Sequence, residues 1–259
     1  MPMTVEAIAV VPEDALGAGI PRFRDEQSGY TFFVAAPAAC PTLWNRYLNG
    51  AHEVYRQFGV EPALEFERTS DGASTALFLL GLDPAGEAVA GVRIQGRYAH
   101  VDEVRGVADW DGRRGSVELR RMVADRIPEG VVEAKGAWVA RDSPHRSALG
   151  DVVSRAVLHG ALLLDARFGF ATVATFTVPR HRASGAVRAA HIPSVPYPDA
   201  RYRTVPIWWD TRTYRAFADR SQSARIRAET RALAEADHSY FAAPPGSERV
   251  AQGRDGHGR

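Results

Sequence analysis

Residues 131–178 constrain the fold of this 259-residue chain most strongly, because two apolar strands there flank one long helical segment. We predict a buried strand at 131–140, a polar loop at 141–150, a helix at 151–169 and a second strand at 170–178. A helix that connects two strands of one sheet packs on one face of it, in a right-handed crossover. The loop precedes a helix N-terminus, where free backbone N–H groups and the helix dipole favour a bound phosphate.

The segments around this unit favour a mixed sheet. Two apolar strands within 75–96 flank the turn residues Asp83, Pro84, Ala85 and Gly86, which predicts a hairpin. Residues 42–58 have apolar side chains at helical spacing, with Thr42 as the expected N-cap and Gly59 as the stop. The other predicted elements are a strand at 5–11, a strand at 31–37, a loop or irregular helix at 97–115, a strand at 116–125, a short helix at 179–192, a strand at 204–210 and a polar helix at 212–237.

This order of elements predicts an α/β fold with a mixed, largely antiparallel central sheet and helices on both faces. The expected divisions are an N-terminal extension with the first strand at 1–40, the main domain at 41–212, a C-terminal helix at 213–241 and a disordered tail at 242–259.

Composition excludes several classes of function. A formal net charge of +1 gives no general attraction to nucleic acid. The single cysteine, Cys40, excludes an internal disulfide and suits a reducing compartment. Because the N-terminus lacks a basic signal-peptide start and no apolar run reaches the ~20 residues of a membrane span, we expect a cytoplasmic protein, either monomer or homodimer. The histidines show no metal-ligand spacing, so we expect no metal site.

Several short segments occur in an informative order. They are Gly91–Arg93 at the end of the hairpin, Val117–Arg121, Trp138–Ala140 before the loop, Arg146–Gly150 leading into the helix, and Arg201–Thr204 leading into Trp208–Asp210. In this order they resemble the GNAT acyltransferase superfamily, and within it the branch of acyl-homoserine-lactone synthases and long-chain N-acyl amino acid synthases. The resemblance covers about residues 40–212, the GNAT-like acyltransferase domain.

The resemblance implies that an acyl-CoA, or the pantetheine arm of an acyl-carrier protein, binds where two strands splay apart, with its pyrophosphate on the loop. No permanently bound cofactor is expected. The expected donor-binding residues are Trp138, Val139, Ala140, Arg146, Ser147, Ala148, Leu149, Gly150 and Asp151. The chain departs from the family pattern at Ala148, which stands where the first loop glycine is usual.

Transfer of an acyl group to an amine requires a group that accepts a proton. The two candidates are Glu133, within the first buried strand, and Glu118, whose surroundings resemble the Glu-x-x-Arg strand of the homoserine-lactone branch. Strand alternation would place Glu133, Lys135, Ala137 and Val139 on one face. The alternative is that both glutamates only form ion pairs, Glu133 with Lys135 and Glu118 with a neighbouring arginine.

Tyr197 lies where the resemblance implies an acid that protonates the leaving thiolate; as an alternative, Tyr197 and Tyr202 are packing anchors. We assign substrate binding to Arg93, Arg120 and Trp208, and expect one of Trp208 and Trp209 to lie in the core and the other at the surface.

The resulting hypothesis is an N-acyltransferase that moves an acyl group from acyl-CoA or acyl-carrier protein to the amine of a small acceptor such as an amino acid. One alternative is a non-catalytic module that binds a CoA-type ligand or a partner, which the missing glycine at Ala148 favours. Another is a different reaction on the same fold, such as lactonising signal synthesis or decarboxylation.

Overall fold

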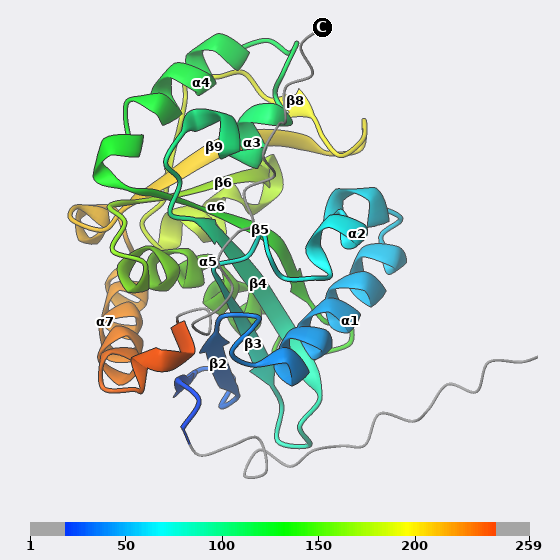
Figure 1. Ribbon diagram of the computed structural model, residues 1–259, viewed down its shortest axis with the longest axis vertical. Helices are drawn as coiled ribbons and strands as arrows, with labels where there is room; N and C mark the ends of the chain where they lie inside the picture. Colours follow the sequence, from blue (N-terminus) through cyan, green and yellow to red (C-terminus); the bar gives the residue numbers. More distant parts are fainter. Residues whose placement is uncertain (1–18, 242–259) are drawn as a thin grey trace, which may run out of the picture.

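The computed structural model describes residues 19–241, which form one open sheet with helices on both faces (Figure 1). The strands are β1 (Arg22–Arg24), β2 (Thr31–Ala35), β3 (Leu77–Leu82), β4 (Ala88–Gly96), β5 (Val131–Val139), β6 (Phe168–Ala174), β7 (Val187–Arg188), β8 (Val195–Pro196) and β9 (Arg203–Asp210). The α-helices are α1 (Pro41–Gln57), α2 (Phe66–Thr69), α3 (Arg105–Ala108), α4 (Ser116–Ala124), α5 (Arg146–Leu163), α6 (Val178–Ala183) and α7 (Arg220–Ala234). Short 3-10 turns include η2 (Glu61–Leu64) and η6 (Tyr214–Ala216).

The sheet has the strand order β1-β2-β3-β4-β5-β6-β9-β7, and β8 also pairs with β9. Each of these neighbouring pairs is antiparallel except β5 and β6, which run parallel and are connected through α5. The predicted fold class, a mixed and largely antiparallel sheet with helices on both faces, is therefore confirmed.

The two parallel strands separate soon after they meet. They pair only over Val131–Glu133 of β5 and Phe168–Phe170 of β6. Beyond that point β6 continues beside β9, and β5 continues beside β4. Within residues 19–241, the β6-facing edge of β5 therefore has no strand partner from Ala134 onward.

A bulge in β5 changes which side chains share a face. Gly91 pairs with Trp138 and Arg93 with Lys135, so three steps along β5 oppose two along β4. Gly136 lies within this bulge and has a φ of 60°, a conformation that glycine adopts without strain. The prediction that Glu133, Lys135, Ala137 and Val139 all share one face is therefore wrong beyond the bulge. Trp138 packs towards α1, while Val139 packs towards α5.

The core has two layers, one on each face of the sheet. Helix α5 is buried along most of its length, and together with α7 it covers one face. Helix α1 covers part of the opposite face, and α3 with α4 covers the rest. The polar side chains described below lie between these last two clusters, on the α1 and α3 face of β4 and β5.

The predicted strand at 116–125 is wrong, because these residues form helix α4. Its buried residues are Leu119, Met122 and Val123, whose spacing of three and four is that of a helix face. Gly115 precedes the helix with a φ of 82° and turns the chain into it.

Several predicted boundaries also shift. Helix α5 begins at Arg146 rather than Asp151, because residues of good helix propensity continue the helix into the predicted loop. Cys40, not Thr42, is the N-cap of α1, since Pro41 with its fixed φ takes the first helical position. The predicted helix at 179–192 ends at Ala183, shortly before Gly185 with its φ of 96°.

Other differences are smaller. The strand expected at 170–178 is β6, which begins and ends earlier, and the long C-terminal helix begins only after Asp219, its N-cap. The predicted strand at 5–11 and the tail at 242–259 lie outside the described residues.

Candidate active site

A cavity of about 460 Å³ opens where β5 and β6 separate, and we name it the splay cavity. Its walls come from β5 and β6, the first turns of α5 and α6, the end of α1 and the loop that contains Tyr197. The parting of the strands and the bulge in β5 together create this space. Backbone groups at the unpaired edge of β5 are therefore available to an extended ligand there.

The N-terminus of α5 lies at the splay cavity and has no side-chain cap. Arg146 and Ser147 are exposed in this first turn. The N–H of Arg146 bonds the carbonyl of Ser143, while among residues 19–241 no acceptor is bonded to the N–H groups of Ser147 and Ala148. These free amides and the positive end of an 18-residue helix favour an anion at this position.

Arg180 is a residue of this site that the sequence did not indicate. Its guanidinium packs over Gly150, where an added Cβ would lie 2.7 Å from Nη1. Its Nε also lies 3.1 Å from Asp151 Oδ1, so the predicted donor-binding Asp151 is engaged in an ion pair. Both Arg146 and Arg180 line the splay cavity, which gives its α5 end two positive side chains.

His181, next to Arg180, also lines the splay cavity. Burial, and secondarily the charge of Arg180, lower the pKa of this imidazole to about 4, so it is neutral at pH 7. Its Nδ1 lies 2.9 Å from the hydroxyl oxygen of Ser154 on α5.

Lys135, which lines the splay cavity, forms a buried ion pair with Asp109. Its Nζ lies 2.7 Å from Asp109 Oδ2, and each side chain is 8% exposed. Burial lowers the pKa of Lys135, but Glu133, Tyr197 and Asp109 raise it by more, so the lysine stays charged. The Glu133–Lys135 ion pair considered from the sequence is thus replaced by one with Asp109, a residue of the predicted loop.

Tyr197 lies above this pair, with its ring centroid 5.7 Å from Lys135 Nζ. Burial and the carboxylate of Asp109 raise the pKa of Tyr197, while Lys135 opposes this shift. Tyr197 also lines the splay cavity. The structure therefore provides a protonated phenol at the splay cavity, close to a charged lysine.

Glu133 is fully buried and accepts three hydrogen bonds. They come from the backbone N–H groups of Arg105 (2.9 Å) and Gly106 (2.8 Å) and from the hydroxyl of Tyr98 (3.1 Å). Burial raises the pKa of the Glu133 carboxyl, and Lys135, Tyr98 and Gly106 offset part of that rise. Glu133 thus holds the start of α3 in place and is linked to Tyr98.

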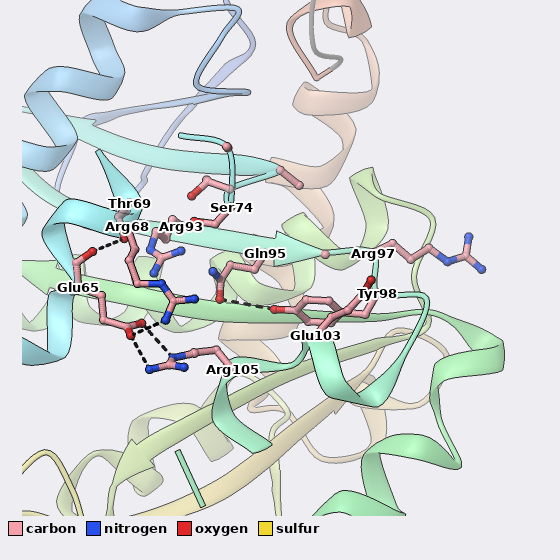
Figure 2. Close-up of a pocket in the computed structure, with 14 residues that line it drawn as sticks. Glu65, Arg68, Thr69, Ser74, Arg93, Gln95, Arg97, Tyr98, Glu103 and Arg105 are labelled. Carbon is pink, nitrogen blue, oxygen red and sulfur yellow. Dashed lines mark hydrogen bonds and ion pairs between the residues drawn. The ribbon is translucent and has the colours of Figure 1, made fainter. Parts of the chain in front are cut away.

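A second cavity, of about 400 Å³, lies on the α1 and α3 face of β4, and we name it the arginine cavity (Figure 2). The residues that line it include Arg68, Arg93, Arg97 and Arg105, together with Glu65, Glu103, Thr75, Gln95 and Tyr98. The segment η2–α2 separates it from the splay cavity, since Val60 and Ala63 line the splay cavity whereas Glu65 and Arg68 line the arginine cavity.

Arg93, predicted to bind substrate, is 2% exposed and lines the arginine cavity. Three other predicted site residues lie elsewhere. Glu118 is exposed on α4, so the strand on which its role was based does not exist. Arg120 is exposed on the same helix and pairs with Asp102. Trp208 is buried against Phe170, with ring centroids 4.6 Å apart.

The prediction that one of Trp208 and Trp209 lies at the surface is wrong. Trp208 and Trp209 are both buried, because they belong to the cores on opposite faces of β9. Trp138 contributes to the wall of the splay cavity, but its indole is 3% exposed and packs against Tyr47 of α1. The bulge in β5 causes this orientation.

Sequence reasoning missed Asp109, Tyr98 and Arg105, which surround the two strand residues Glu133 and Lys135. One signal was present: a lysine within an apolar strand requires a carboxylate partner if it is buried. Within the described range 19–241, no cluster of histidine, cysteine, aspartate and glutamate could hold a metal ion, and no helix is long and apolar enough to cross a membrane.

Known proteins resemble this chain in sequence and in fold. The uncharacterized protein Rv1356c of Mycobacterium tuberculosis is 41% identical over 219 residues, covering 83% of each chain, and the uncharacterized protein Mb1391c of Mycobacterium bovis is equally similar. No family model matches the chain. Among solved structures, FeeM, an N-acyl amino acid synthase from uncultured soil microbes, superposes with a TM-score of 0.54 at 12% identity, over 71% of this chain and 93% of that chain. The chain belongs to the family of these mycobacterial proteins and has the fold of the GNAT acyltransferases.

Proposed function

We propose that the protein is an N-acyltransferase that moves an acyl group from a thioester, acyl-CoA or acyl-carrier protein, to the amine of a small acceptor. The observation that carries this proposal is the splay cavity, which lies between the free edge of β5 and the uncapped start of α5. A pantetheine thioester needs both features, an extended backbone edge for its amides and an anion site for its phosphates.

The donor's pyrophosphate would lie on the N–H groups of Ser147 and Ala148, with Arg146 and Arg180 beside it. Ala148 does not prevent this, because it lies in the first turn of a helix and its φ is not positive. The pantetheine would follow β5 from Val139 towards the bulge. Backbone N–H groups there would polarise the thioester carbonyl and stabilise the oxyanion that forms on it.

The acceptor amine must lose a proton before or during its attack on the thioester. Glu133 has no exposed surface and its oxygens already accept three hydrogen bonds. We infer that Glu133 acts through Tyr98: the phenol oxygen takes a proton from the amine while its own proton passes to Glu133. The raised pKa of this carboxyl suits it to accept a proton.

Collapse of the tetrahedral intermediate breaks the carbon–sulfur bond and releases a thiolate. Tyr197 lines the splay cavity and its raised pKa keeps the phenol protonated, so it can give its proton to that sulfur. The charge of Lys135, 5.7 Å from the ring centroid, would stabilise the phenolate that results.

Release of free thiol from acyl-CoA, measured with a panel of acyl chain lengths and of amines, tests the proposal. Tyr197→Phe should lower kcat about 10²-fold or more, the range of a lost general acid, with little change in KM for acyl-CoA. Tyr202→Phe is the matched control from the same loop and should keep kcat, because its ring packs against Phe176 rather than above Lys135. Mass spectra of the product would separate N-acylation from lactone formation or decarboxylation, and acyl-CoA binding with no turnover on any amine would identify a binding module instead.

A further inference from the structure

The arginine cavity contains a buried cation without a counterion. Arg93 is 2% exposed, and its Nε and Nη1 atoms have neither solvent contact nor a hydrogen-bond partner within the described part of the chain. The hydroxyl oxygen of Thr75, which lines the same cavity, is also buried and unbonded. Because buried charges are unfavourable unless they are paired, such a guanidinium indicates that an anion binds there.

The other charges of the arginine cavity are mostly paired with one another. Arg105 Nη2 lies 2.6 Å from Glu65 Oε1, and Arg68 Nη1 lies 3.5 Å from the same oxygen. Arg97 pairs with Asp165, and its guanidinium points away from the other labelled side chains (Figure 2). Glu103 accepts hydrogen bonds from two backbone N–H groups. As far as residues 19–241 are concerned, Arg93 is therefore the arginine of this cavity that has no ion-pair partner.

This anion is not the donor's pyrophosphate. Arg93 lies opposite Lys135 on the α1 and α3 face of the sheet, whereas α5 covers the other face. Its position points instead to the acceptor: a Cβ placed on Gly136, in the bulge of β5, would lie 3.4 Å from Arg93 Nε. The guanidinium thus lies beside the stretch of β5 where the thioester would be held.

We propose that the arginine cavity binds the carboxylate of the acceptor on Arg93, so that the acceptors are amines that carry a free carboxylate, such as amino acids. This rests on the acyltransferase function proposed above. A planar guanidinium matches a carboxylate with two parallel hydrogen bonds, and neutral Thr75 and Gln95 line the same cavity. The amine, a few ångströms from the carboxylate in an amino acid, would then lie near Tyr98.

The purified wild-type protein provides the first test, with each of a panel of amino acids compared with its own amide. We expect kcat/KM to be roughly 10- to 150-fold higher for the acids, the range of one charge-assisted hydrogen bond. Equal rates for acids and amides would overturn the proposal, as would a preference for a phosphate-bearing amine such as phosphoethanolamine.

Variants locate the preference on Arg93. Arg93→Met should reduce the ratio of acid to amide to within about threefold while turnover of the amides persists, because one charged partner is removed without a change in the reacting groups. Arg97→Gln is the control. Arg97 directly follows β4, and its guanidinium pairs with Asp165 and points away from the other labelled side chains, so this variant should keep the wild-type ratio. An unchanged ratio in Arg93→Met would refute the assignment.

A failure of the acyltransferase function would be distinguishable. If no amine supports thiol release, calorimetric titration of the same amino acids and amides into the wild-type protein decides the question. Binding of the acids but not of the amides would keep the carboxylate site without the transferase, and no binding of either would overturn the site as well.

Discussion

Replacement of Glu133 by glutamine separates its two roles, because it removes the negative charge and preserves the shape. The carboxylate accepts the N–H groups of Arg105 and Gly106 and the hydroxyl of Tyr98. A glutamine keeps one carbonyl oxygen but turns an NH₂ group towards at least one of these donors. One buried N–H or O–H is then left without an acceptor.

The expected loss of unfolding free energy is about 2–4 kcal/mol. The loss of one charge-assisted hydrogen bond costs ~1.5–3 kcal/mol and the unsatisfied buried donor ~1–3 kcal/mol, while the removal of a buried charge offsets part of this cost. For a domain of this size each kcal/mol lowers Tm by about 2–4 °C, so Tm should fall by roughly 4–16 °C. Acyl transfer, measured well below this new Tm, should also fall, because Tyr98 loses its proton acceptor.

The assay is thermal unfolding together with thiol release at 20 °C, in Glu133→Gln and in Glu118→Gln. The control variant should match the wild type in both, since Glu118 is exposed on α4. A Tm of Glu133→Gln within about 1 °C of the wild type would refute the three-donor arrangement. A normal Tm decrease with unchanged turnover would leave Glu133 as an anchor of α3 only.

Three further predictions follow from other parts of the structure. Arg155→Met should lower Tm by roughly 6–20 °C in thermal unfolding, because it removes the arginine that pairs with the buried carboxylates of Asp25 and Glu229, at a cost of about 3–5 kcal/mol. A decrease below 3 °C would contradict this. The pKa of His181 is about 4 in the folded state and ~6.5 when unfolded, so between these pH values the unfolded state binds one more proton. The unfolding free energy measured in urea should therefore fall by up to about 1.4 kcal/mol per pH unit as the pH decreases from 6.5 to 4. In His181→Gln the unfolding free energy should depend less steeply on pH, and a slope identical to that of the wild type would contradict the low pKa of His181. Ala148→Gly should lower the unfolding free energy by up to about 1 kcal/mol, as glycine does within a helix, while KM for acyl-CoA stays equal or falls. A raised KM would contradict the proposal that the backbone N–H of residue 148 binds the phosphate.

Local pattern was sufficient to predict most of the sheet. The apolar runs that form β3 to β6 and β9 are bounded by turn residues, and the pattern of a strand or hairpin depends mainly on neighbouring residues. Helix α4 was missed because its nine residues are too few to distinguish a helix from a strand by periodicity. Its three buried residues became informative only once the packing partners were known.

The candidate site was only half predictable for a related reason. Glu133 and Lys135 were recognisable as charges within an apolar strand, but their partners Asp109, Tyr98 and Arg105 lie in a polar loop far along the chain. Their pairing is tertiary, so no spacing in the sequence reveals it. The bulge had a local signal, since a glycine inside a strand often marks one, yet its effect on Trp138 depends on register with β4.

The buried charges also bear on the choice between an enzyme and a binding module. Replacing a buried ion pair such as Lys135–Asp109 by apolar residues is often neutral or stabilising, so such pairs are not explained by stability alone. Here Lys135 of that pair lines the splay cavity, Arg93 lines the arginine cavity, and the buried Glu133 lies on the same strand as Lys135. A module that only bound a CoA-type ligand would need the start of α5 and the free edge of β5, where we place the acyl donor. An acceptor that approached from the opposite face of β4 and β5 would meet the unpaired guanidinium of Arg93, and for this reason we favour transfer over binding alone.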